Sequence, residues 1–96
     1  MAALWISHIN VTNPDQFAKY VELAGPAIRK HGGEFLARGA RFVQLEGNKR
    51  ERNVVVRFES IEAAEACYNS PEYQEAVSHA RGASERDLMV IEVTEP

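Results

Sequence analysis

A few polar side chains lie at positions where an otherwise apolar segment would direct them into a cavity or an interface. His8 alternates with Leu4 and Ile6 on one face of such a segment, and Asn10 follows on the same face. An imidazole can accept or donate a proton near neutral pH, so His8 is the best candidate for a catalytic residue and, with Asn10, for a ligand contact. A hydrogen-bonded histidine at a protein interface would give the same pattern.

Arg38 and two tyrosines complete the candidate ligand-binding residues. Arg38 stands beside Gly39 in a segment with strand character, where a bulge could turn its side chain towards a cavity and let it bind a carboxylate through two hydrogen bonds. A surface or inter-subunit ion pair would suit Arg38 equally well. Tyr68 and Tyr73 could form a wall and a hydroxyl contact for a small ligand. Packing between two helices is their alternative role.

Other kinds of chemistry have little support in the sequence. Cys67 lies on the apolar side of a predicted helix with no neighbouring base, so we expect a buried, unreactive thiol. The three histidines show no metal-ligand spacing, and no glycine-rich phosphate loop or nucleophile motif is present. We therefore expect neither a metal nor a cofactor.

Composition indicates a small, soluble, folded domain. The chain has 96 residues, a net charge of −3 and 45% hydrophobic residues, which predicts one domain over residues 1–96. The only basic cluster, Lys49-Arg50-Glu51-Arg52, is interrupted by a glutamate and falls at a predicted turn, so we expect no nucleic-acid partner. No apolar run is long enough to span a membrane, and a single cysteine suits a reducing compartment, so we expect a cytoplasmic protein.

The first half of the chain predicts a strand, a helix and a strand. Residues 3–11 are apolar and end before Asn13-Pro14, a helix start, and the spacing of apolar residues predicts a helix up to the glycines 32–33. Gly25-Pro26 should kink or break that helix. Residues 34–45 read as a strand with a bulge or bend at 38–40. Turn-forming residues 46–49 should then close a hairpin.

The second half predicts a strand, two short helices and a strand. Residues 53–58 form the strand, Ser60 begins one helix, and Ser70-Pro71 begin another that continues to about residue 81. Residues 82–86 should be a loop and residues 87–93 the last strand. The order is an α+β, ferredoxin-like β-α-β-β-α-β domain: one antiparallel four-stranded sheet with its helices on one face.

The strands carry apolar residues on both faces, whereas the helices can cover only one. Val54, Val55 and Val56 are consecutive, and Leu88 to Ile91 form a second apolar run. An uncovered apolar face of this size is unusual in a monomer. We therefore expect a homodimer that buries the open sheet face, either as a two-fold interface or as a closed dimeric α+β barrel.

Several sequence strings also resemble a known family. They are Phe35-Leu36-Ala37-Arg38-Gly39, Leu45-Glu46-Gly47, Tyr68-Asn69-Ser70-Pro71-Glu72-Tyr73-Gln74, His31-Gly32-Gly33 and Arg81, in order over nearly the whole chain. Together they resemble the bacterial domain of unknown function 1330. The chain departs from that family's usual residues at Asn13, Arg57 and Glu59. The family is similar to the dimeric α+β barrel superfamily, which implies a ferredoxin-like protomer and a dimer but no particular reaction.

The expected function is the binding of a small aromatic or carboxylated molecule, either between the sheet and the helices or at the dimer face. Because related barrels include cofactor-independent monooxygenases, isomerases and dehalogenases, the resemblance also allows an enzyme. A structural or interaction dimer without a ligand is the third alternative. If His8, Asn10 and Arg38 form one site, they must face the same cavity.

Overall fold

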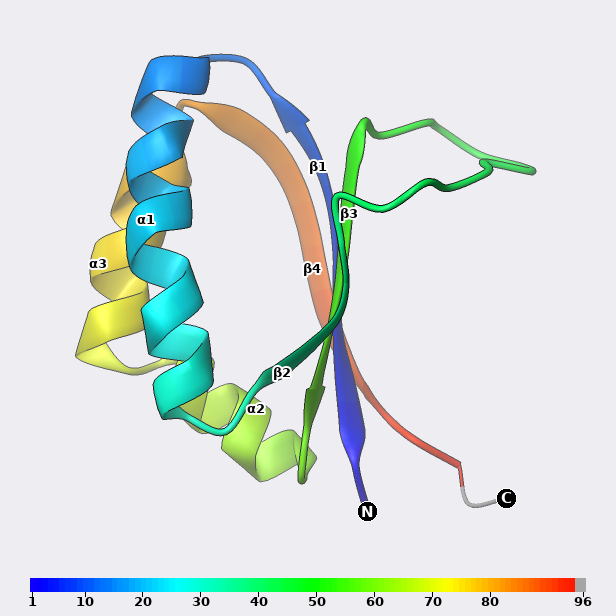
Figure 1. Cartoon of the computed structure of the whole chain (residues 1–96), viewed down its shortest axis with the longest axis vertical. Coiled ribbons are helices and arrows are strands. Elements are labelled where there is room, and N and C mark those ends of the chain that lie inside the picture. The colour runs from blue at the N-terminus through cyan, green and yellow to red at the C-terminus, as the bar shows by residue number, and fades with distance from the viewer. Residues whose placement is uncertain (95–96) are drawn as a thin grey trace.

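The computed structural model describes residues 1–94, and its strands form one antiparallel sheet in the order β2-β3-β1-β4. The elements are β1 (Ala3–Val11), α1 (Pro14–Lys30), β2 (Glu34–Arg38), β3 (Arg52–Phe58), α2 (Ile61–Tyr68), α3 (Pro71–Ala80) and β4 (Ser84–Glu92). All three helices lie on one face of the sheet, and the other face is open (Figure 1). The α+β, ferredoxin-like fold predicted from the sequence is confirmed.

Helix ends lie where polar caps and glycine allow them. The side-chain oxygens of Asn13, Ser60 and Ser70 accept hydrogen bonds from backbone N–H groups in the first turns of α1, α2 and α3. Each cap satisfies a donor that the helix leaves unpaired. After α1 the chain turns at Gly32, whose φ of 84° is in the left-handed region that favours glycine.

Of the kink or break predicted at Gly25-Pro26, the break does not occur, because α1 is one continuous helix of 17 residues. A proline inside a helix loses one backbone hydrogen bond and costs about 3 kcal/mol. The apolar stripe continues through this point, however, and Ala24, Ala27 and Ile28 are all buried. Burial of residues on both sides of Pro26 outweighs the local cost.

The prediction of a long strand over residues 34–45 is also wrong. β2 ends at Arg38, and its irregular register with β3 lies between Phe35 and Ala37, earlier than expected. Gly39 has a φ of 66° and turns the chain out of the sheet. Residues 39–51 form a long loop that extends beyond β2 and β3 (Figure 1), instead of a tight hairpin turn.

The last strand begins earlier than predicted. Residues 84–86, assigned to a loop from the sequence, belong to β4, which pairs with β1 over its whole length. The side chains of Arg86, Leu88 and Val90 therefore share the helix-facing side of the sheet with Trp5, which pairs with Val90.

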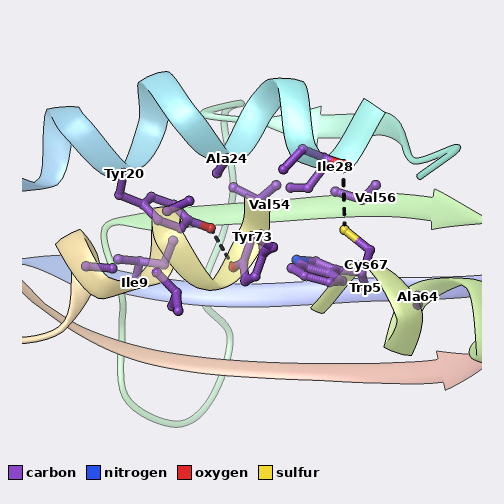
Figure 2. Packing of buried hydrophobic residues seen from close by; sticks show 14 of the residues in the cluster. Trp5, Ile9, Tyr20, Ala24, Ile28, Val54, Val56, Ala64, Cys67 and Tyr73 are labelled. Carbon is purple, nitrogen blue, oxygen red and sulfur yellow. Dashed lines mark hydrogen bonds between the residues drawn. The ribbon is translucent and has the colours of Figure 1, made fainter. Parts of the chain in front are cut away.

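The core lies between the sheet and the helices and is rich in aromatic rings. Trp5, Phe58 and Tyr73 are fully buried, and the Trp5 and Tyr73 rings meet edge to face with their centroids 5.1 Å apart. Figure 2 shows Cys67 beside Trp5 in this core, with its sulfur directed at a backbone oxygen of α1. Within residues 1–94 no helix is both long and apolar enough to cross a membrane.

The open face has an apolar part and a polar part. Ile6 of β1 lies between Val55 of β3 and Met89 of β4, and Leu4 pairs with Ile91. Met89 and Ile91 are about half exposed, which is high for large apolar side chains. We call Leu4, Ile6, Val55, Met89 and Ile91 the open-face patch.

Candidate functional site

Arg86 of β4 joins two tyrosine hydroxyl groups beneath the helices. Its Nη2 donates hydrogen bonds to the hydroxyl oxygens of Tyr20 at 3.0 Å and of Tyr73 at 2.9 Å. The two hydroxyl groups lie 2.8 Å apart and point towards each other (Figure 2). Tyr20 comes from α1 and Tyr73 from α3, so one guanidinium group ties three elements together.

This cluster has more donors than acceptors. The Nε of Arg86 is buried and has no hydrogen-bond partner in residues 1–94. Only one of the two phenol hydrogens can be used between Tyr20 and Tyr73, so one more donor remains. An unpaired buried donor costs about 1–3 kcal/mol.

The positive charge of Arg86 also lacks a negative partner. Among residues 1–94 every side-chain ion pair involves other cations. Burial opposes the charge, but the surrounding tyrosine oxygens outweigh it and keep the pKa of Arg86 above its ordinary value. Burial raises the pKa of Tyr73 far above its usual range, so its hydroxyl stays neutral. The cluster is therefore a fixed cation that would attract an anion.

A cavity of about 340 Å³ lies next to this cation, between α3 and β4. Arg86 and Leu88 line it from the strand, Arg81 from the end of α3, and Tyr68 from the end of α2. This volume is in the range of small-molecule sites. The arrangement can hold an acidic group at Arg86 and an apolar body against Tyr68 and Leu88.

The structure brings Tyr68 and Tyr73 to this region and gives them different roles. Their ring centroids are 5.5 Å apart. Tyr68 is 37% exposed and faces the cavity, whereas Tyr73 is fully buried with its hydroxyl bound to Arg86. Tyr73 would therefore act on a ligand through Arg86 and not by direct contact.

His8 and Asn10 lie on the opposite, open face of the sheet. His8 pairs in register with Asn53 and Asp87, and its Nδ1 forms a hydrogen bond with Oδ1 of Asn53. The side-chain oxygen of Asn10 accepts a hydrogen bond from the backbone N–H of Glu51. His8 lines a separate, polar depression of about 240 Å³ beside the 39–51 loop.

Arg38 joins neither group. It pairs with Val54, which is buried under the helices, and its guanidinium group lies 4.4 Å from the centre of the Phe35 ring. His8 and Arg38 are thus on opposite faces of the sheet, so the condition for a single site of His8, Asn10 and Arg38 is not met. The physical reason is the register shift in β2, which gives Phe35 and Arg38 the same helix-facing side.

Metal-ligating side chains do not gather in the part of the chain described here: within residues 1–94 no group of three or more His, Cys, Asp or Glu could hold a metal ion.

Comparison with protein families gives one match, and it covers nearly the whole chain. The sequence profile of "Domain of unknown function (DUF1330)" matches residues 2–94. The chain belongs to the DUF1330 family. Among curated proteins, none matches this DUF1330 protein.

Solved structures similar to this DUF1330 protein confirm its fold. A protein of unknown function from Rhodopseudomonas palustris has a TM-score of 0.77 at 19% identity, over 99% of this chain and 84% of the other. A dimeric ferredoxin-like protein of unknown function from Jannaschia sp. has a TM-score of 0.77 at 13% identity, over 97% and 100%. SnoaB, a cofactor-independent oxygenase from Streptomyces nogalater, has a TM-score of 0.69 at 9% identity, over 99% and 95%. At these identities the likeness concerns the fold alone.

Sequence analysis missed Arg86 as a site residue of the DUF1330 protein because it placed residue 86 in a loop. One signal was available: Arg86, Leu88 and Val90 alternate with Asp87, Met89 and Ile91. Extending that alternation by one step would have directed Arg86 inward, beside the helices.

Proposed function

We propose that this protein binds a small organic carboxylate in the cavity between α3 and β4. The observation that carries this proposal is Arg86, a partly buried cation that lines the cavity and has no acidic partner in residues 1–94. A carboxylate in the cavity would supply the missing negative charge and accept hydrogen bonds from the exposed part of the guanidinium group. The apolar side chains beside Arg86 favour an aromatic or aliphatic body on the ligand.

A binding role suits the cavity better than proton transfer. The ionisable groups that line it are Tyr68, Arg81 and Arg86. None of these is a base near neutral pH, and the described lining holds no histidine or carboxylate. The fold shared with SnoaB, a cofactor-independent oxygenase, keeps catalysis as the second candidate. Dioxygen uptake in the presence of a bound ligand would favour that candidate.

The test compares acids with their uncharged amides. We expect benzoate and phenylacetate to raise the melting temperature and to give a binding isotherm, and benzamide and phenylacetamide to do neither. Replacing Arg86 by Met should weaken acid binding by roughly 10- to 100-fold, because a charged hydrogen bond contributes about 1.5–3 kcal/mol.

Arg38→Met is the matched control, since it removes an arginine that lies outside the cavity. Equal binding of acids and amides would contradict the proposal, as would equal losses in the two arginine variants. His8→Ala should leave acid binding unchanged, because His8 lies on the other face of the sheet.

For the assembly we propose a homodimer formed through the open-face patch. The patch is apolar, lies opposite the helices and is covered by nothing else in residues 1–94. Similar folds described as dimeric support this arrangement. His8 and Asn10 would then lie at the polar margin of the interface.

A further inference from the structure

A second cavity of about 240 Å³ lies along the same strand and shares two lining residues with the first. Tyr68, at the end of α2, and Leu88, on β4, belong to both cavities. The second cavity is also lined by Trp5, Met89 and Val90 and by the exposed Glu65 and Asn69. Tyr68 and Leu88 thus border both cavities.

The two cavities differ in chemistry. Arg81, Ser84 and Arg86 make the first one polar and positively charged. In the second cavity, Trp5, Leu88 and Val90 present rings and aliphatic groups. A ligand that used both would have an anionic end and an apolar end.

The strand sets the length of such a ligand. Arg86, Leu88 and Val90 point to the same side of β4 at every second residue. A strand rises about 3.3 Å per residue, so Arg86 and Val90 are separated by about 13 Å along it. The aromatic rings of Tyr68 and Trp5 line part of this length, and their ring centroids are 6.2 Å apart.

We infer that the natural ligand is an elongated monocarboxylate, with its carboxylate at Arg86 and its apolar chain passing between Tyr68 and Leu88 towards Trp5. This inference rests on the proposed function and adds the class of carboxylate and the path it takes. Tyr68 is then a specificity-determining residue, because it contacts the middle of a long ligand and only the end of a short one.

A homologous series tests the path: propionate, hexanoate and decanoate, each below the concentration at which it forms micelles. The extended chain of decanoate is about as long as the Arg86–Val90 span. Affinity should rise by up to about fourfold for each methylene that becomes buried, and should level off once the chain fills the groove. Trp5 is the only tryptophan of the chain. Its emission should change with decanoate and stay constant with propionate.

Tyr68→Ala should lower the affinity for decanoate several-fold more than the affinity for propionate, and Tyr68→Phe should leave both close to wild type. Suppose that short acids bind and that this binding depends on Arg86. If the affinity then does not depend on chain length, or if Trp5 emission stays constant with decanoate, the elongated path is wrong and the carboxylate site stands. If no acid binds, or if Arg86→Met changes nothing, the proposed function itself fails. The Trp5 measurement uses wild-type protein, so the outcome does not depend on the folding of a variant.

Discussion

At the level of single residues, Cys67 is fully buried, with its sulfur 3.9 Å from the carbonyl oxygen of Ala27. Burial, and secondarily the charge of Glu72, raises the pKa of the Cys67 thiol to about 11, from an ordinary value of about 9. Between these two values the unfolded chain loses a proton that the folded chain retains. Stability from this group is therefore complete below about pH 9 and decreases as the pH rises, by at most about 1.4 kcal/mol per pH unit.

Urea unfolding of the wild type and of Cys67→Ala at a series of pH values checks this prediction. Other groups titrate in the same range in both proteins. The difference between the two proteins in the slope of unfolding free energy against pH therefore isolates the thiol. Parallel slopes from pH 9 to pH 11 would show that Cys67 ionises equally in both states.

The burial of Cys67 was predicted correctly, because helical spacing alone indicates which side of a helix faces the core. Tyr68 and Tyr73 stay candidate site residues. Arg86 was missed, because a charged residue at the edge of a predicted loop is normally solvated. Only the tertiary structure reveals that Tyr20 and Tyr73, from two helices, supply the oxygen atoms that make its burial acceptable. Partners so distant in sequence leave no local pattern.

At the level of elements, Ser70 fixes α3 against α2. Its hydroxyl accepts a hydrogen bond from the backbone N–H of Tyr73 at 3.2 Å and donates one to the carbonyl of Cys67 at 2.7 Å. Ser70→Ala should lower the free energy of unfolding by roughly 2 kcal/mol, because both a helix cap and a buried acceptor lose their partner. Ser70→Thr should keep the free energy of unfolding close to that of the wild type, because threonine retains the hydroxyl group.

Ser60→Ala is the control, since Ser60 caps α2 with a single hydrogen bond at 3.0 Å. This substitution should lower the free energy of unfolding by about 1 kcal/mol. Equal losses for Ser60→Ala and Ser70→Ala in urea unfolding would contradict the bridging role of Ser70.

Sequence patterns located most elements, and the failures have a common physical cause. Capping residues and apolar periodicity gave the starts of the helices and the extent of β1. The continuity of α1 at Pro26 and the early end of β2 depend on packing and pairing with distant segments, which outweigh local preferences.

At the level of the whole molecule, the open-face patch predicts the oligomeric state. Ile6 lies at its centre, between Val55 and Met89. Ile6→Asp would bury a carboxylate in the proposed apolar interface and should convert the dimer to a monomer. Ala66→Asp, at an exposed position on α2, should remain dimeric. Light scattering coupled to gel filtration measures both, and a monomeric wild type at micromolar concentration would refute the dimer.

The pairing of β1 with β4 has a consequence for biosynthesis. Ala3 lies opposite Glu92, so the first strand of the sheet in chain order pairs with the last one. Contacts between such distant parts of a chain form slowly, because a long loop must close first. Arg86 also lies on this last strand. The growing chain therefore exposes an unpaired edge of β1 until β4 has been synthesised, and the cavity beside Arg86 is complete only after β4 has paired with β1.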